Sequence, residues 1–457
     1  MLWKPGSGLT CLRKTAFRVY DVTSMTRLRR SVVLCFLLTL CMAFPVNMRA
    51  FTQSSSVVTP QEIAKLAESR QVHEAFKWFS AHEPELRRWQ IQITKIPAPP
   101  FGERKRAEWV RDRFKELGLQ DVGIDKIGNV VGLSRGTDQK TPLVAVTAHI
   151  DTVFPAETPL NIKIEGNKLH GPGIGDNAAG MVGLFAMAAA LKASGLKHHA
   201  GILFVANVGE EGEGDLRGMR YLFQESKWKD QIGPTLVLDG AGADTVVNAA
   251  LGSKRFEVVI RGPGGHSWAD FGTPNPIVVL SKAVAKFSET AVPGAPKTSF
   301  NIGVIQGGTS VNSIPESADM RVDIRSASTA EIDALEKALR EAVANAVREV
   351  QDAKSRKGIV TAEIKLIGER PAADLKADSR IYGALKAVDM HLDLRTQPRR
   401  ASTDANIPLS MGREAISIGA GGNGGGAHTV NEWFDATDRD LGLKRILLTV
   451  LAVAGAQ

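Results

Sequence analysis

Cysteine is almost absent from this sequence of 457 residues, since Cys11, Cys35 and Cys41 all lie within the first fifty. If those fifty residues are a leader that is removed, the remaining chain can form no disulfide and has no thiol ligand or nucleophile. Any metal site must then be built from His, Asp and Glu side chains. A chain without cysteine also suits an oxidising compartment such as a periplasm.

Long hydrophobic runs are also scarce. The run from Ser31 to Phe44 is too short to span a bilayer comfortably, and Arg27, Arg29 and Arg30 precede it. We therefore predict that residues 1–50 are a signal peptide and that the protein is exported, either periplasmic or secreted. The alternative is an uncleaved leader that anchors the protein in a membrane.

Outside this leader, the chain has almost no excess of positive charge. Residues 1–50 contain eight basic residues and one acidic residue, so they contribute +7 of the formal net charge of +8. The remainder of the chain is therefore nearly neutral. A basic chain would otherwise suggest binding to nucleic acid or to membrane surfaces. We predict no nucleic-acid partner, and membrane contact only through an uncleaved leader.

The apolar pattern of the chain predicts an α/β fold. Residues 60–118 have apolar positions at helical spacing, and 143–148, 202–206 and 236–238 are continuous apolar runs of strand length. Between the first two runs, an Ala-rich stretch over 178–193 has helix start and stop signals. An order of strand, helix and strand implies a mostly parallel central sheet.

A second pattern begins near residue 253. It predicts strands, helices and strands in the order βαββαβ, near 255–261, 275–290, 299–306, 318–325, 329–351 and 359–367. This is the order of a ferredoxin-like α+β domain. Because 414–419 and 437–455 return to buried-strand and helix character, we predict an insertion at 253–371. The catalytic domain would then consist of residues 51–252 and 372–457.

Acidic residues and histidines follow the predicted strands of the first domain. They are His149 and Asp151 after the first strand, Asp176 on a Gly-rich turn, Glu210 and Glu211 after the second strand, Asp239 after the third, and His428 after the last. Singly, each has a plain explanation as a turn or capping residue. Together they lie at the carboxyl edge of the sheet, where open α/β sheets place their sites. Two His and three carboxylates can hold two zinc ions, which together activate water and polarise a carbonyl.

These residues, in this order, closely resemble a family of co-catalytic zinc peptidases, from about residue 90 to the C-terminus. The family includes carboxypeptidase G, peptidase T, acetylornithine deacetylase, succinyl-diaminopimelate desuccinylase, the carnosine dipeptidases and aminoacylase. The resemblance implies that His149, Asp176 and Asp239 bind one zinc ion, and that Asp176, Glu211 and His428 bind the other. Asp176 would bridge the two ions, for which Co or Mn could substitute.

The same resemblance implies roles for two more acids. Asp151 would orient His149, because metal-bound imidazoles usually need such a partner. Glu210 would be the general base that deprotonates the shared water and later protonates the leaving nitrogen.

The insertion contains further matches. Gly262–Ser267 resembles a motif whose histidine, often donated by the partner subunit of a dimer, stabilises the oxyanion, so His266 is the candidate here. Asn312, Arg325 and Arg370 lie in segments that resemble positions binding a substrate carboxylate, a group that an arginine fork suits. The alternative for the two arginines is a surface or interdomain ion pair. The resemblance thus implies a lid that also forms a homodimer.

Two positions depart from the family pattern. Asn177 and Ala178 stand where the family often has Asp and Lys, which leaves Asp176 intact but puts the support around it in doubt. Asp239 stands where other members have Glu, and this choice leans toward aminopeptidases and dipeptidases and away from deacylases.

The predicted function is zinc-dependent hydrolysis of a peptide or amide bond in a small, carboxylate-bearing substrate. An N-acyl-amino-acid deacylase is the alternative, since it would use the same machinery with a different pocket. A third hypothesis is a non-catalytic binding protein on the same fold. Such relatives usually lose a ligand or the base, and here neither is missing.

Overall fold

The computed structural model describes residues 58–352 and 358–456. The predicted leader at 1–50 lies outside these residues, as does most of the stretch that links it to the first helix. Within the described ranges, no helix has the length and apolar character that crossing a bilayer requires.

Four helices open the described chain, as predicted over 60–118. They are α1 (Pro60–Ala67), α2 (Arg70–Ala81), α3 (Glu83–Thr94) and α4 (Arg104–Glu116). Thr59 begins α1 through a capping box with Glu62, in which each side chain bonds to the other residue's backbone N–H. Phe79 of α2 and Trp89 of α3 are buried in the same core as side chains of the central sheet.

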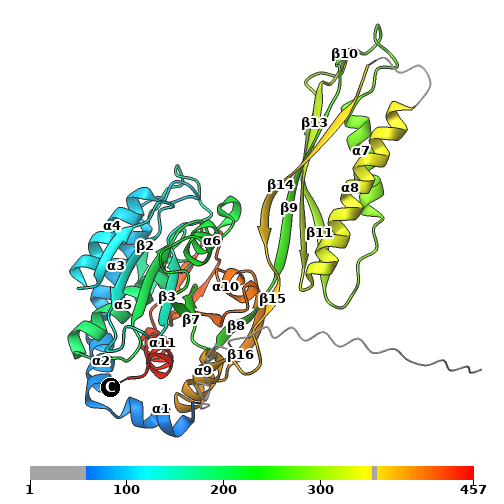
Figure 1. Ribbon diagram of the computed structural model, residues 1–457. Coiled ribbons are helices and arrows are strands. Elements are labelled where there is room, and N and C mark those ends of the chain that lie inside the picture. Colours follow the sequence, from blue (N-terminus) through cyan, green and yellow to red (C-terminus); the bar gives the residue numbers. More distant parts are fainter. Residues whose placement is uncertain (1–57, 353–357, 457) are drawn as a thin grey trace, which may run out of the picture. The chain divides into compact units, whose positions relative to one another are not determined.

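The central sheet has nine strands in the order β1-β2-β6-β3-β7-β17-β8-β15, with β16 paired to β8. They are β1 (Gln120–Ile124), β2 (Val130–Ser134), β3 (Leu143–His149), β6 (Ile202–Asn207), β7 (Ile232–Leu238), β8 (Thr245–Ala250), β15 (Ala373–Asp374), β16 (Gln397–Ala401) and β17 (Ala415–Ile418). The middle strands β6, β3, β7 and β17 are parallel, whereas β1 and β2 add an antiparallel edge. The predicted α/β fold with a largely parallel sheet is confirmed (Figure 1).

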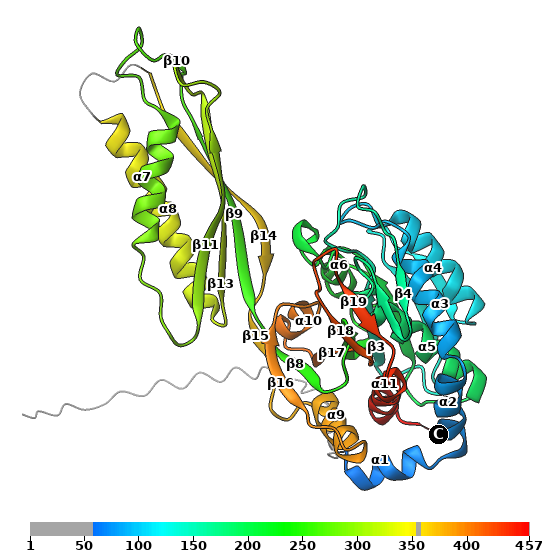
Figure 2. The ribbon, with the colours of Figure 1, turned by 180° about the vertical axis from the view of Figure 1, so that it is seen from behind.

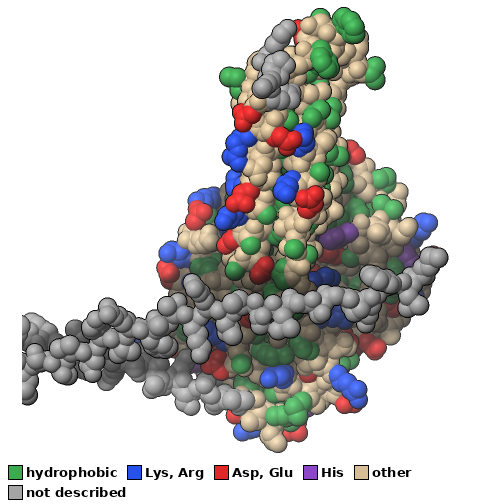
Figure 3. Space-filling view, turned by 90° about the vertical axis from the view of Figure 1, so that its right-hand side faces the viewer, with side chains coloured by type: hydrophobic (Ala, Val, Ile, Leu, Met, Phe, Trp, Pro, Cys, Tyr) green, Lys and Arg blue, Asp and Glu red, His purple; other side chains and the backbone are tan. Residues whose placement is uncertain are grey.

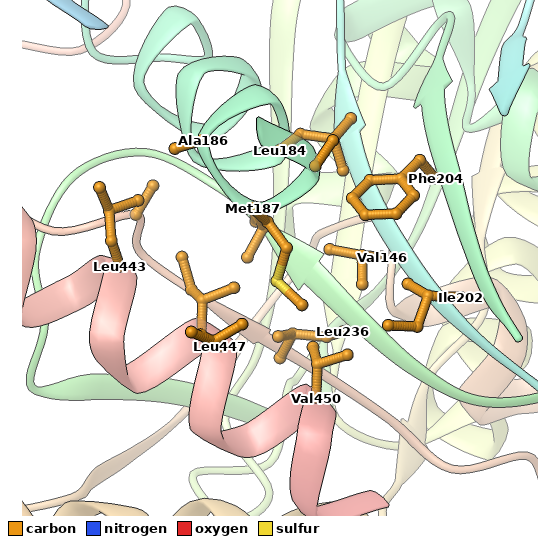
Figure 4. Packing of buried hydrophobic residues seen from close by; sticks show 14 of the residues in the cluster. Val146, Leu184, Ala186, Met187, Ile202, Phe204, Leu236, Leu443, Leu447 and Val450 are labelled. Carbon is orange, nitrogen blue, oxygen red and sulfur yellow. The ribbon is translucent and has the colours of Figure 1, made fainter. Parts of the chain in front are cut away.

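Helices cover both faces of this sheet. One face is covered by α5 (Ala178–Ser194), α9 (Arg380–His391) and α11 (Arg439–Ala454), and the other by α6 (Arg217–Gln224) and α10 (Asn406–Ser410). Figure 4 shows Met187 of α5 and Leu447 of α11 meeting Leu236 of the sheet. The helix α5 is buried almost all round, which explains its Ala-rich sequence.

Side chains along β3 alternate between the two faces of the sheet, and this decides which of them can face the predicted metal site. Val146 and Ala148 belong to the core under α5, whereas Ala145 belongs to the core on the opposite face. Because side chains alternate along a strand, His149 lies on the Ala145 face.

The βαββαβ order predicted for the insertion is also found. Its elements are β9 (Gly252–Arg261), α7 (Pro276–Ser288), β11 (Thr298–Gly307), β13 (Ser317–Ser326), α8 (Thr329–Gln351) and β14 (Thr361–Arg370). The sheet order is β11-β13-β9-β14, every pair is antiparallel, and both helices lie on one face (Figure 2). A separate core fills the space between sheet and helices, with Phe256, Phe287 and Leu339 among its residues.

The domain boundaries at 253 and 371 stay a prediction. The exposed face of α8 carries charged side chains. It carries ion pairs one helical turn apart, such as Arg340 with Glu336 and Lys337 with Glu341. Figure 3 shows basic and acidic side chains interspersed over the face that it presents.

A small sheet brings two distant loops together. Its strands are β4 (Lys163–Glu165), β5 (Lys168–His170), β18 (Asn423–Gly425) and β19 (Trp433–Asp435), in the order β18-β19-β5-β4. Trp433 pairs with His170. The Gly-rich loop after β5 therefore runs beside the segment that precedes β19.

Candidate metal centre

The five predicted metal ligands lie together in two overlapping groups of three residues, which we call triplets. His149, Asp176 and Asp239 form the first triplet, and Asp176, Glu211 and His428 form the second, with the ligand atoms of each triplet within 4.8 Å of one another. Asp176 belongs to both, so it is the residue that could bridge two ions.

The distances from the histidines define the geometry of the triplets. His149 Nε2 lies 3.1 Å from Asp176 Oδ1 and 3.9 Å from Asp239 Oδ1. His428 Nε2 lies 3.1 Å from Asp176 Oδ2 and 3.2 Å from Glu211 Oε1. The two carboxylate oxygens of Asp176 thus face different imidazoles, as a bridging carboxylate requires.

The parallel strands explain why these side chains meet. His149 ends β3, Glu211 follows β6 and Asp239 follows β7, so all three lie at the carboxyl edge of neighbouring strands. Asp176 comes from the Gly-rich loop before α5. His428 comes from the turn between β18 and β19, where its φ is +65°.

The donor set fits zinc. It offers only imidazole nitrogens and carboxylate oxygens, which are ordinary zinc ligands. Asp176 Oδ1 is buried and accepts no hydrogen bond of good geometry, which leaves a ligand oxygen unsatisfied. A cluster of acids with an unsatisfied buried oxygen is costly unless cations occupy it.

The electrostatics of the two triplets also indicate that the centre favours positive charge. Burial opposes a charge on His149, but Asp151, Asp176 and Asp239 outweigh it and raise the pKa of the imidazole. The hydrogen bond to Asp176 raises the pKa of His428 to about 9. Burial raises the pKa of Glu211 to about 6. The acids around the imidazoles therefore favour positive charge at this position, which is the charge that metal ions would supply.

Zinc uptake should accordingly depend on pH. A histidine must lose its proton to ligate, and the pKa of His428 near 9 keeps it protonated at neutral pH. We expect zinc binding to release protons and to tighten as pH rises from about 6 to about 9. The raised pKa of His428 also stabilises the fold of the protein without zinc. This contribution is fully present at a pH below the pKa of the same histidine in the unfolded chain, and it is lost as pH rises through about 9.

Isothermal titration calorimetry in two buffers of different ionisation enthalpy measures both the affinity and the proton release. An affinity that does not change over this pH range, with no proton release, would contradict the prediction.

Asp151 supports the centre at three points. Its carboxylate accepts hydrogen bonds from the backbone N–H of Glu210 at 3.0 Å and of Glu211 at 2.8 Å. Its carbonyl oxygen lies 3.1 Å from His149 Nδ1, whereas its carboxylate Oδ1 is 3.7 Å from that nitrogen, beyond hydrogen-bond length. Asp151 thus contacts His149 through its backbone and fixes the Glu210–Glu211 turn through its side chain.

Glu210 lies beside the triplets and is held by Arg370. Its carboxylate belongs to a third close group, with His149 and Glu211. Arg370 Nη1 donates to Glu210 Oε1 at 3.0 Å and to Ser402 at 3.0 Å, and both charged side chains are almost fully buried. Burial raises the pKa of Glu210 well above its usual value, while Arg370 opposes this shift.

The remaining predicted residues lie in the insertion. His266 is exposed in β10 (Gly265–His266), which pairs with β12 (Ser313–Ile314), and the Asn312 carbonyl accepts a hydrogen bond from Ser267 N–H at 3.0 Å. Arg325 Nε donates to Asp323 at 2.6 Å. In the described ranges, none of His266, Asn312 and Arg325 bonds to the triplets. Their roles stay predictions, as does substrate binding by Arg370.

Comparison with known proteins decides the family. The model of peptidase family M20/M25/M40 matches residues 145–452, which contain both triplets. This chain belongs to that family. The match confirms the resemblance found in the sequence, and the family groups peptidases with other hydrolases of amide bonds.

Individual M20 relatives are distant. Carboxypeptidase G2 from a Pseudomonas strain is 29% identical over 52% of this chain, and succinyl-diaminopimelate desuccinylase from Burkholderia cenocepacia is 26% identical over 49%. The matches span only 56% and 64% of those relatives' own lengths.

Two solved structures share the fold. A tripeptidase from Staphylococcus aureus aligns with a TM-score of 0.66 at 21% identity, covering 81% of this chain and 98% of the tripeptidase. Human carnosine dipeptidase 1 aligns with a TM-score of 0.64 at 14% identity, covering 84% and 98%. At these identities the likeness establishes the fold alone.

Asn177, which stands where the M20 family often has Asp, bonds to the backbone around the ligand residues. Its Nδ2 donates to the Leu238 carbonyl at 2.9 Å, and its Oδ1 accepts from the N–H of Gly180 and of Gly240, both at 3.0 Å. Asn177 therefore caps α5 and also bonds to the residues on either side of Asp239. An aspartate could not donate to the Leu238 carbonyl. The capping signal was visible in the sequence, but the bonds to β7 were not.

Two further acids in the M20 centre have no predicted role. Asp404 is fully buried, accepts a hydrogen bond from Asn207 at 2.7 Å, and has its pKa raised to about 7 by burial. Glu432 is also buried and contacts the loop that carries Asp176. Asp404 follows no apolar strand, and Glu432 looks like an ordinary turn residue, so the sequence pattern marks neither.

Proposed function

We propose that this chain is a zinc-dependent hydrolase that cleaves a peptide or amide bond in a small, carboxylate-bearing substrate. The observation that carries the proposal is the pair of triplets sharing Asp176, with Glu210 beside them. A carboxypeptidase and a desuccinylase among the relatives agree with this class of reaction.

Glu210 is suited to move the proton in this reaction. Zinc, when bound, supplies Lewis-acid polarisation of a carbonyl and activation of water. Glu210 takes a proton from the attacking water, whose oxygen bonds to the carbonyl carbon; the carbon–nitrogen bond then breaks, and the same proton goes to the leaving nitrogen. Arg370 holds Oε1 of Glu210, and Asp151 holds its backbone N–H, so the carboxylate keeps one position during the transfer.

We also propose that His266 acts across a homodimer. His266 is exposed and bonds to none of the five ligands of its own chain, which supports a role in the site of a second copy. The edge strand β11 offers a pairing surface, since it exposes Val304 and Ile305 and has an open edge within the described sheet.

Mixed dimers test this proposal. Each of His266→Ala and Glu210→Gln should inactivate a homodimer, whereas mixing the two proteins should restore part of the activity, because one site in the mixed dimer keeps both groups. Absence of any recovery, with subunit exchange demonstrated, would show that His266 does not act in the partner's site.

A substrate screen separates the peptidase from the deacylase. We expect dipeptides and tripeptides with a free carboxylate to be hydrolysed with kcat/KM at least about tenfold above that of N-acyl amino acids. Asp239 in place of Glu is the feature that favours peptides. The reverse preference would support the deacylase. Hydrolysis of neither class by protein with two bound zinc ions would support a binding protein.

A further inference from the structure

Glu432 is a buried carboxylate bound by three backbone N–H groups. It is 1% exposed. Its Oε2 accepts from Gly173 N–H at 2.7 Å, and its Oε1 accepts from Gly175 N–H at 2.7 Å and from Asp176 N–H at 2.6 Å. The bond to Asp176 fixes the backbone of the residue common to both triplets.

Glu432 also belongs to the loop that carries His428. The Glu432 N–H donates to the Thr429 carbonyl at 3.2 Å, and its own carbonyl accepts from Gly171 N–H at 2.8 Å. The following residue, Trp433, pairs with His170. One residue therefore connects the loop of Asp176 to the loop of His428, and these two side chains are ligands in the same triplet.

If this residue only filled space in the interior, it would not need to be a carboxylate. Within the described ranges the Glu432 carboxylate bonds to backbone N–H groups and to no Lys or Arg side chain, and a buried carboxylate without a cation is costly. Charge-assisted bonds from backbone N–H groups offset part of this cost. The same bonds give the Gly-rich loop a defined conformation that its glycines alone would not impose.

We infer that Glu432 is a positioning residue that fixes Asp176 relative to His428 and so preorganises the second metal triplet. The inference rests on the proposed function, because it requires that the triplets bind metal. Residues outside the ligand shell that orient ligands typically change metal affinity about 10- to 100-fold when mutated.

Glu432→Gln is the direct test. The amide replaces one oxygen by an N–H₂ group, so at least one backbone N–H of the loop faces a donor. We expect calorimetric titration of the metal-free protein with zinc to show that the second ion binds about 10- to 100-fold more weakly than in wild type. At low zinc kcat should fall while KM for the substrate stays unchanged, and excess zinc should restore kcat.

Gly175→Ala supplies a second variant that keeps the carboxylate. A Cβ at residue 175 would lie 2.9 Å from Glu432 Oε1, which is too close, and φ of Gly175 lies outside the left-handed region. The added methyl group should push the carboxylate away from the loop without changing any charge. It should weaken zinc binding in the same direction as Glu432→Gln.

Asp389→Asn is the matched control. Asp389 is a 1% exposed carboxylate in α9 that accepts from Arg445 at 2.6 and 2.8 Å, away from the triplets. The variant should lower the Tm and leave zinc affinity unchanged. Equal weakening of zinc binding in Asp389→Asn and Glu432→Gln would overturn the inference, because general destabilisation would explain both.

The remaining outcomes separate the two proposals. If wild type binds two zinc ions and Glu432→Gln binds both with the same affinity, the positioning role is wrong and the proposed function stands. If wild type itself does not bind two zinc ions, the proposed function is wrong and the positioning role is wrong with it.

Discussion

Glu210→Gln is expected to lower kcat about 10²- to 10⁴-fold while both zinc ions remain bound. The amide cannot accept the proton of the attacking water, and Glu210 belongs to neither of the two ligand triplets that share Asp176. The glutamine oxygen can still accept the hydrogen bond from Arg370, so the fold around it should persist. Steady-state kinetics combined with metal analysis of the same sample measures both quantities.

Glu213→Gln is the control for this variant. Glu213 lies on the same loop, and its side chain is 77% exposed beside Arg321. Removing one exposed charge there should change kcat by less than about twofold, because surface ion pairs contribute little. A Glu210→Gln protein with two zinc ions and a kcat near that of the Glu213→Gln control would show that Glu210 is not the base.

Asp176→Ala is expected to remove both zinc ions and to lower hydrolysis on the order of 10⁴-fold or more. Asp176 is the one residue that the two triplets share. Its loss leaves each triplet with two ligands, where zinc sites normally have at least three protein ligands. Mass spectrometry for bound metal, together with an assay at saturating substrate, measures the effect.

Single-triplet variants provide the comparison. Asp239→Ala removes a ligand from the first triplet only, and His428→Ala removes one from the second only. Each should retain about one zinc ion per chain. Retention of two zinc ions by Asp176→Ala would contradict its bridging position.

The edge of the sheet that holds the metal centre could be predicted from the residues because several ligands follow local signals, whereas the grouping of the ligands into two triplets was implied by the family resemblance. His149 and Glu211 end or follow apolar strands that are parallel neighbours, so an argument about strand ends places them at one edge. Asp239 follows β7, which pairs with β3, for the same reason. The order of the insertion was equally accessible, since its strands alternate and its long helix α8 is strongly periodic.

Contacts across long sequence separations could not be predicted in this way. Glu432 bonds to a loop more than 250 residues earlier, and nothing in its own neighbourhood indicates that contact. Substrate binding by Arg370 stays a prediction, and its bond to Glu210, 160 residues earlier, had no signal in the sequence. The role of Asp151 in orienting His149 stays a prediction, but the two backbone N–H bonds that its carboxylate accepts could not be foreseen, because they depend on how the turn after β6 closes.

Zinc stoichiometry tests the central claim most directly. The protein is stripped with a chelator, titrated with zinc, and analysed for bound metal and for hydrolysis of a small peptide at each step. Two zinc ions per chain are expected at saturation, with hydrolysis appearing as they bind, because the two triplets share Asp176. Binding of less than one zinc ion per chain, or hydrolysis by the metal-free protein at the same rate, would contradict the claim.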